Sequence, residues 1–194
     1  DTEWAMHNRL NPSMKPIPDS LGGSYITYPF AHTAMQLVPS EKYFASHPEY
    51  FAEVKGKRLP GKHIQLCLTN SDVLKIATAQ VFTWIKEHPE ANVFSVDQSD
   101  GEGNCECKFC KAIDDREGSP SGSLLTFVNQ IADTVGKVHP EIKIQTFAYA
   151  YTEVPPKTIR PADNVTIRLC HYNYCSAHPM EGCDNQKPFR DRLN

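Results

Sequence analysis

Two stretches of the chain repeat apolar residues at helical spacing. The first comprises Leu74, Ala77, Val81 and Trp84, and the second comprises Leu124, Val128, Ile131 and Val135. A spacing of three to four residues predicts helices that bury one face. We expect the first helix to begin after Asn70 or Ser71, either of which can cap it, and to end at His88-Pro89. The second should follow Ser119-Pro120-Ser121.

Short apolar runs alternate with these helices and predict strands. They lie at 93–96, 142–149 and 165–170, with a brief extended run at 64–68. The order strand, helix, strand, helix, strand is typical of an α/β fold with a mostly parallel sheet. The link 151–164 is too rich in proline for a normal crossover helix. We expect an irregular crossover there, and antiparallel pairing of the last two strands is the alternative.

The first third of the chain, residues 1–62, follows neither spacing. Prolines punctuate it at positions 12, 16, 18, 29, 39, 48 and 60. This density excludes long helices and central strands. We expect a short strand at 25–28 and short helical turns within 41–51. The chain is therefore predicted to be one domain over 1–194, irregular over 1–62 and built of β/α units over 63–194.

Composition bounds the class of protein. The chain has 194 residues, 40% of them hydrophobic, and a net charge of -3 without a basic stripe. These values fit a folded domain and argue against nucleic acid as a partner. The apolar runs are too short for a membrane span. A complete eight-stranded (β/α) barrel takes ~250 residues, which is more than this chain has. We therefore expect the chain to be a segment of a larger barrel, with the remainder of its own full-length chain as a partner.

Polar side chains follow three of the expected strands. The segments are Asp97-Gln98-Ser99-Asp100, Tyr149-Ala150-Tyr151-Thr152 and His171-Tyr172-Asn173-Tyr174. Parallel α/β folds bind ligands at the carboxyl ends of their strands. Paired carboxylates can bind sugar hydroxyls or act as acid and base, and an aromatic ring can stack on a sugar. Each segment also has a plainer interpretation, as a solvated turn, as rim packing or as a capping loop.

The chain has seven cysteines, and three of them form the pattern Cys105-x-Cys107-x-x-Cys110. Three soft ligands so close together suit a structural zinc, with a fourth ligand from Cys175, Cys183, His171 or His178. Disulfides that join loop 101–110 to loop 170–183 are the alternative. Either arrangement would hold those two loops together. A redox role needs Cys-x-x-Cys at a helix start, which this stretch fits poorly.

Many short stretches together resemble the family called domain of unknown function 4838, a bacterial group related to TIM-barrel glycoside hydrolases and compared with alpha-glucuronidases. The resemblance covers nearly the whole chain. It rests on Ala31-His32-Thr33, Tyr43-Phe44, His47 to Phe51, Gly56-Lys57-Arg58, Gln65 to Asn70, Ser95 to Asp100 with the cysteine pattern, Glu117 to Gly122, Ala148-Tyr149 with Thr152, Pro155-Pro156-Lys157, Arg160-Pro161, Asn164-Val165 and Arg168-Leu169-Cys170.

The resemblance implies a partial (β/α)8 TIM-barrel-like segment and a polysaccharide ligand, with part of any catalytic machinery on later strands. It implies no required cofactor and a secreted, periplasmic or cell-surface location. Asp100, or Asp97, would be the acid/base residue, Tyr149 a stacking platform, and His32, Gln98 and His171 hydroxyl contacts. One departure is visible, because the family usually has Ser-Gln-Asn-Asp where this chain has Asp97 to Asp100. A non-catalytic carbohydrate-binding barrel and a metal-stapled interaction module are the alternative functions.

Overall fold

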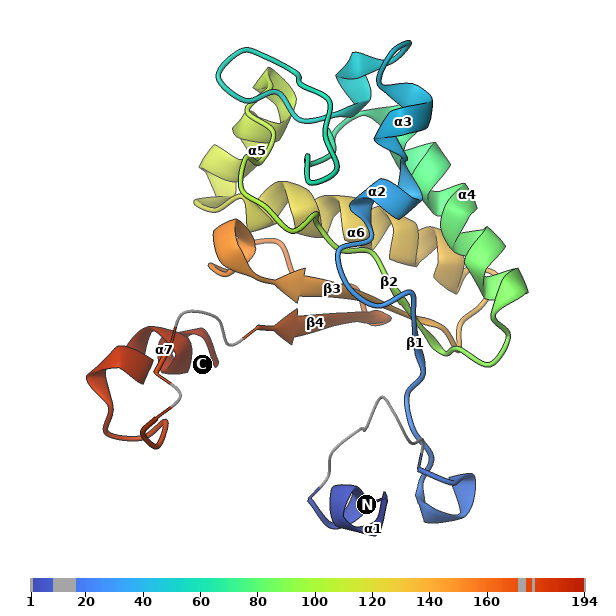
Figure 1. The fold of residues 1–194 in the computed structure, drawn as a ribbon, viewed down its shortest axis with the longest axis vertical. Coiled ribbons are helices and arrows are strands. Elements are labelled where there is room, and N and C mark those ends of the chain that lie inside the picture. Colours follow the sequence, from blue (N-terminus) through green and yellow to red (C-terminus); the bar gives the residue numbers. More distant parts are fainter. Residues whose placement is uncertain (1, 9–16, 171–173, 176, 194) are drawn as a thin grey trace.

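A parallel four-stranded sheet forms the centre of the protein (Figure 1). The structure is a computed structural model that describes residues 2–8, 17–170, 174–175 and 177–193. The strands are β1 (Thr27–Tyr28), β2 (Val93–Ser95), β3 (Lys143–Ala148) and β4 (Val165–Leu169). They lie side by side in sequence order, and each neighbouring pair is parallel. The predicted α/β class is confirmed.

The helices vary widely in length. They are α1 (Thr2–His7), α2 (Ala34–Leu37), α3 (Ser40–Tyr43), α4 (Ser71–Glu87), α5 (Lys108–Glu117), α6 (Ser121–Gly136) and α7 (Lys187–Leu193). Short 3-10 helices span Asp19–Leu21, Pro48–Tyr50, Ala150–Thr152 and Asp184–Gln186. No helix in the described part of the chain is long and apolar enough to cross a membrane.

Helices α4 and α6 pack against each other and against one face of the sheet (Figure 1). Their predicted apolar stripes form the main core, together with Phe94 of β2 and Ile144 of β3, which are both fully buried. Helix α4 begins where the sequence predicts, because Oδ1 of Asn70 accepts hydrogen bonds from the backbone N–H groups of Asp72 and Val73, at 2.9 and 3.2 Å.

The elements in the described residues of the stretch 1–62 are short. Strand β1 is only two residues long and lies at the edge of the sheet, where a short strand tolerates nearby proline. The helical elements between residues 34 and 50 are equally short. The extended run at 64–68 does not join the sheet, because Leu66 forms an isolated antiparallel bridge with Phe51 instead.

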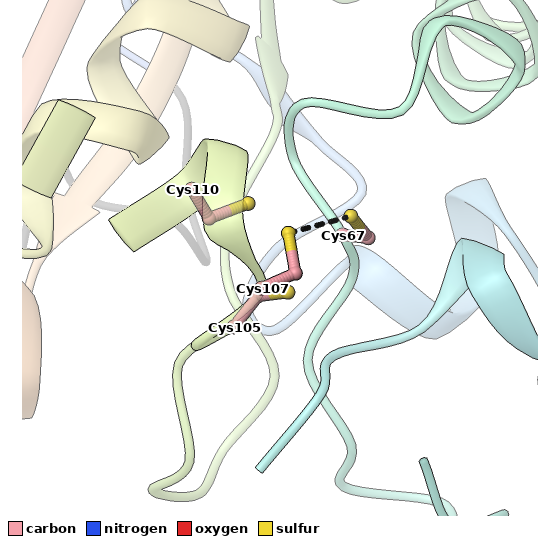
Figure 2. Close-up of side chains that lie close together, drawn as sticks. All are labelled: Cys67, Cys105, Cys107 and Cys110. Atoms are coloured by element: carbon pink, nitrogen blue, oxygen red, sulfur yellow. Dashed lines mark hydrogen bonds between the residues drawn. The ribbon is translucent and has the colours of Figure 1, made fainter. Parts of the chain in front are cut away.

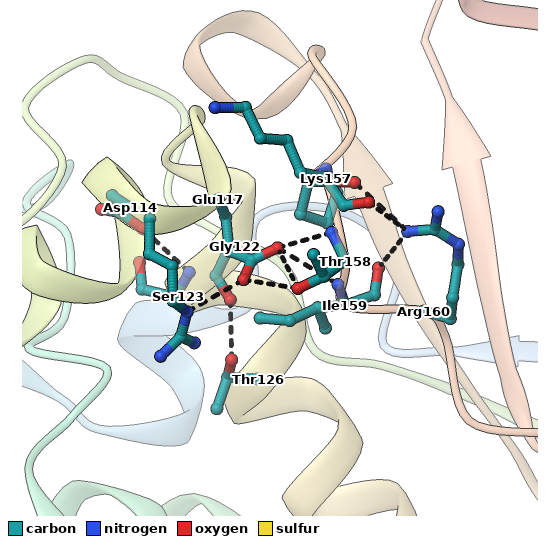
Figure 3. Close-up of polar contacts among 11 residues, drawn as sticks. Asp114, Glu117, Gly122, Ser123, Thr126, Lys157, Thr158, Ile159 and Arg160 are labelled. Carbon is teal, nitrogen blue, oxygen red and sulfur yellow. Dashed lines mark hydrogen bonds and ion pairs between the residues drawn. The ribbon is translucent and has the colours of Figure 1, made fainter.

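The proline-rich crossover from β3 to β4 contains no α-helix, yet the two strands are parallel. The antiparallel alternative is therefore wrong. Glu117 at the end of α5 holds the crossover in place (Figure 3). Its buried carboxylate accepts hydrogen bonds from the backbone N–H groups of Thr158 and Ile159, at 2.7 and 3.1 Å. The hydrogen bonds from Thr158 are the main reason that the pKa of Glu117 is lowered to about 2.

Helix α5 is a ten-residue helix that the apolar spacing does not predict. Most of its residues are polar, and its three buried members are Cys110, Asp114 and Glu117. It ends at Gly118, whose φ of 73° is a left-handed conformation that glycine adopts without strain. Helix α6 starts soon afterwards and approaches α5 closely at Gly122, where an added Cβ would lie 2.8 Å from Cβ of Glu117.

Candidate metal centre and strand-end site

Four buried cysteines lie together, with their side chains directed toward one another (Figure 2). They are Cys67, Cys105, Cys107 and Cys110, and all four Sγ atoms lie within 4.8 Å of one another. Cys67 precedes α4, whereas Cys105 and Cys107 precede α5 and Cys110 lies in its first turn. The cluster thus joins the crossover between β1 and β2 to the crossover between β2 and β3.

The fourth member corrects the sequence prediction, which took the partner from loop 170–183. Cys67 occupies that place, so the cysteine pattern does not join loop 101–110 to loop 170–183. His171, one of the predicted partners, lies outside the described residues. Cys67 was missed because it stands alone in an extended run. Its position just before the capped start of α4 resembles that of Cys107 before α5, and this similarity is the signal that could have indicated it.

The distances between the sulfur atoms indicate a ligand set and not a disulfide. A tetrahedral zinc with Zn–S bonds of about 2.3 Å places its sulfurs about 3.8 Å apart. The Sγ atoms of Cys67 and Cys107 are 3.7 Å apart, far beyond the disulfide length of about 2.05 Å. All seven cysteines, which lie in the described residues, are unpaired. The buried cluster can therefore hold a metal ion.

The surroundings of the cluster favour thiolate ligands. The backbone N–H of Glu53 donates to Sγ of Cys105 at 3.4 Å, and the Thr69 hydroxyl is hydrogen-bonded to Sγ of Cys110 at 3.2 Å. Donors of this kind orient and stabilise metal-bound sulfur. The Arg58 guanidinium lies close enough for the charges of Cys105 and Cys67 to raise its pKa, although burial by itself would lower it. These groups can offset negative charge on a thiolate cluster.

The thiols of the cluster affect one another's ionisation. Hydrogen bonds from Cys105 and Cys110 lower the pKa of Cys67 to about 3. The pKa of Cys110 is raised, chiefly because its hydrogen bonds with Cys105 and Cys67 leave the proton on its own sulfur. One thiolate is thus stabilised at the expense of the next, as expected when like charges share a small buried space. A divalent cation would remove that conflict.

The Cys-x-x-Cys stretch does begin a helix, contrary to the sequence-based expectation, because Cys107 is the N-cap of α5. A redox pair, however, has to be partly exposed to meet its partner. Cys107 and Cys110 are only 8% and 0% exposed, and both contribute to the four-sulfur cluster. The arrangement therefore suits metal binding better than thiol exchange.

A second group of predicted residues gathers beyond the carboxyl ends of β1, β2 and β3. His32 Nε2 lies 3.7 Å from Oδ1 of Asp100, and the Tyr149 hydroxyl donates to the same oxygen at 3.3 Å. The rings of His32 and Tyr149 have centroids 5.6 Å apart. We call this group the strand-end site. The Asp100 side chain is 56% exposed, so the site is open to a ligand from solvent.

Gln98 connects the loops of the strand-end site through hydrogen bonds. Its side-chain amide is buried and donates to the Tyr149 carbonyl at 3.1 Å and to the Thr152 hydroxyl at 2.7 Å. The backbone carbonyl of Gln98 accepts a hydrogen bond from Nδ1 of His32 at 3.1 Å. Ala31 and His32 have left-handed backbones, with φ of 73° and 55°. Such strain in residues other than glycine is concentrated at functional sites.

Asp97 differs from Asp100 in being closed off from solvent, at 3% exposure. Neither of its carboxylate oxygens has a hydrogen-bond partner among the residues that the structure describes. Burial raises the pKa of Asp97 to about 8, against smaller opposing effects of Ser95 and Arg168. The carboxyl group is therefore largely protonated at neutral pH and can donate a proton.

A third group lies in the C-terminal segment. Cys175, His178 and Cys183 have ligand atoms that all lie within 4.8 Å of one another. Sγ of Cys175 and Nδ1 of His178 are 3.2 Å apart, and this hydrogen bond lowers the pKa of Cys175 to about 7. The sequence singled out all three residues, but as partners of the first cluster. The structure places them in a separate group.

A comparison with family models gives a match over residues 1–194 to the domain of unknown function DUF4838. The chain belongs to this family. The family assignment made from short sequence stretches is thereby confirmed. No curated protein and no solved structure matches the chain. The match to DUF4838 includes the residues of the four-cysteine group and of the strand-end site.

Proposed function

We propose that this DUF4838 chain binds polysaccharide at the strand-end site and is part of a glycoside-hydrolase-like barrel. The observation that carries the proposal is the convergence of His32, Asp100 and Tyr149 from loops that follow three consecutive parallel strands. Ligand sites of parallel α/β proteins lie at the carboxyl ends of the strands. The three side chains supply an aromatic face, a carboxylate and an imidazole, which together suit a sugar ring.

Each side chain has a distinct role in the proposal. The Tyr149 ring stacks on the apolar face of a sugar, and the Asp100 carboxylate and His32 imidazole contact its hydroxyls. Gln98 positions the Tyr149 loop through its two hydrogen bonds. The neutral Asp97 carboxyl is the proton donor if the full site hydrolyses its ligand, because a glycosidase needs one protonated and one ionised carboxyl group.

We propose further that the four-stranded sheet is part of a (β/α)8 barrel. Strands in sequence order with parallel neighbours are the arrangement of a TIM barrel. Thr166, Ile167 and Arg168 of β4 are exposed, so a further strand pairing with β4 would cover them. We propose that such strands come from the remainder of a longer chain. A second carboxylate on one of them would complete a hydrolytic pair.

The test of the strand-end site uses glycan-array binding and release of reducing sugar, with the whole protein. Tyr149→Ala and Asp100→Ala should each weaken glycan binding at least tenfold. Asp163→Ala is the matched control. Asp163 is an exposed aspartate that precedes β4, so it lies at the amino ends of the strands and not at the strand-end site. Binding without sugar release would favour a non-catalytic carbohydrate-binding barrel. Equal binding by all variants would refute the proposed site.

We also propose that the four-cysteine cluster holds a structural zinc ion. The support is four buried sulfurs within 4.8 Å of one another, which is the closed ligand set of structural zinc sites. Elemental analysis should find a zinc equivalent that Cys107→Ser loses and Cys170→Ser retains. Cys170 is a suitable control because it is half-buried and belongs to neither ligand group. Iron in place of zinc, or no metal at all, would contradict this assignment.

A further inference from the structure

The C-terminal segment 174–193 lies apart from the main core and has almost no core of its own (Figure 1). Among its described residues, only Gln186 and Phe189 are buried. The Tyr174 and Phe189 rings are in contact, with centroids 5.3 Å apart. A segment of this size cannot be stabilised by apolar burial alone, and small units of this kind usually rely on a metal or on disulfides.

The backbone around Cys175 and Cys183 is nevertheless held by specific hydrogen bonds. Gln186 donates through its side-chain amide to the Cys175 carbonyl and through its backbone N–H to the Cys183 carbonyl, the latter at 3.0 Å. Arg190 Nη1 donates to the same Cys183 carbonyl at 2.9 Å. These contacts bring together two cysteines that are eight positions apart in the sequence. The two thiols and the His178 imidazole then face one another.

The three ligand atoms match the chemistry of zinc. Two cysteine sulfurs and one histidine nitrogen are among the ligands that zinc prefers, and the atoms lie within 4.8 Å of one another. The segment also contacts the rest of the protein through polar groups. Its Tyr174 hydroxyl donates a hydrogen bond to Glu153, and Nε of its Arg192 lies 3.8 Å from the same carboxylate. A bound ion would therefore make the segment rigid close to the β3–β4 crossover.

We infer that Cys175, His178 and Cys183 form a second zinc site, distinct from the four-cysteine cluster. The site is open, because the described residues supply three ligands and His178 is exposed. A water molecule completes the tetrahedron, as in other three-ligand sites. Its zinc is accessible to chelators, whereas the zinc of the buried four-cysteine cluster is not.

The difference in exposure gives a direct test on the 194-residue chain. The purified protein should contain two zinc equivalents. A chromogenic pyridylazo chelator should remove one of them rapidly, and the second should appear only after a mercurial reagent has blocked the thiols. The double variant Cys175→Ser/Cys183→Ser should lose the rapidly released equivalent and keep the slow one. Cys170→Ser should keep both.

A second variant and a second readout guard against misfolding. His178→Gln leaves both thiols in place and should at least halve the rapidly released zinc, while circular dichroism stays unchanged. With cobalt as the probe, the double variant should lose the component with weaker sulfur-to-cobalt charge transfer, because this site has two thiolates where the cluster has four. A native protein without rapidly released zinc, rapid release that persists in the double variant, or a Cys175–Cys183 disulfide found by peptide mapping would each overturn the inference. A single zinc that is released rapidly and lost in the double variant would support it and would instead contradict the zinc proposed for the four-cysteine cluster.

Discussion

Gln65 and Ser99 form a reciprocal pair of buried hydrogen bonds. The Gln65 amide nitrogen donates to the Ser99 carbonyl at 3.0 Å, and the Ser99 backbone N–H donates to the Gln65 amide oxygen at 2.9 Å. The same nitrogen also donates to the Gly101 carbonyl at 2.8 Å. Gln65 lies two positions before Cys67, and Ser99 lies just before Asp100. The pair thus connects the segment that carries Cys67 of the four-cysteine cluster to the strand-end site.

Replacing Gln65 by leucine should destabilise the protein by roughly 2–4 kcal/mol, because it removes buried hydrogen bonds and leaves their backbone partners unsatisfied. Urea unfolding followed by circular dichroism measures the change. Gln130→Leu is the matched control, since Gln130 is exposed on α6 and should change the free energy of unfolding by less than about 0.5 kcal/mol. Similar losses for the two variants would show that the Gln65 contacts contribute little.

Asp97 should make the protein less stable as the pH rises. Its folded pKa of about 8 lies above the unfolded value of ~3.9, so the folded state binds a proton more tightly. The loss of stability begins near the unfolded pKa, grows through neutral pH and is complete above the folded pKa, reaching roughly 5 kcal/mol at most.

Asp97→Asn should therefore be as stable as the native protein near pH 4 and clearly more stable at pH 8. Urea midpoints across that range provide the measurement. If the proposed acid role is also correct, the same variant would lose glycan hydrolysis while gaining stability. Parallel pH profiles for both proteins would show that Asp97 is not a buried neutral group.

Glu117 has the opposite dependence. Its folded pKa of about 2 lies below the unfolded value of ~4.3, so the stability it contributes is present above the unfolded pKa and is lost as the pH falls toward 2. Glu117→Gln should lower the melting temperature at pH 7 and flatten its decline between pH 5 and pH 2.5. Glu87→Gln, at an exposed position of α4, should keep the native profile. An unchanged acid profile for Glu117→Gln would contradict the anchoring role.

The close approach of α5 and α6 at Gly122 should tolerate no side chain. An alanine Cβ would lie 2.8 and 2.9 Å from Cβ and Cγ of Glu117, which is itself held by the crossover. Gly122→Ala should cost roughly 1–3 kcal/mol, although alanine favours helices over glycine. Thermal unfolding is the measurement, with Asp133→Ala on the exposed face of α6 as the control. A stabilised Gly122→Ala would show that the two helices can separate at little cost.

Loss of the metal that we propose for the four-cysteine cluster should loosen the segments that the cluster joins. In Cys107→Ser, amide hydrogen exchange should increase at least tenfold over 64–70 and 101–112. Exchange in β3 and the core-facing part of α6 should change much less, because those elements are held by apolar burial. Equal rates of amide hydrogen exchange over 64–70 and 101–112 in the native protein and the variant would mean that the sulfurs do not hold these loops.

Local patterns in the sequence determined much of the fold. The stripes of α4 and α6, the cap at Asn70 and the three later strands could be predicted because each depends on neighbouring residues. Helix α5 could not, because its buried face consists of Cys110, Asp114 and Glu117, which no apolar spacing reveals. Its stability depends on partners elsewhere in the chain, namely the other thiols and the crossover at Thr158.

The sequence by itself determined the α/β class, the family and the side chains that gather at the strand ends, since parallel strands bring their carboxyl ends to one edge. Only the tertiary structure decided the rest. It placed Cys67 with Cys105, grouped Cys175 with His178 and Cys183, and buried Asp97 while leaving Asp100 exposed. The physical reason is that ligand sets and desolvation depend on distances through space, which residue spacing along the chain does not specify.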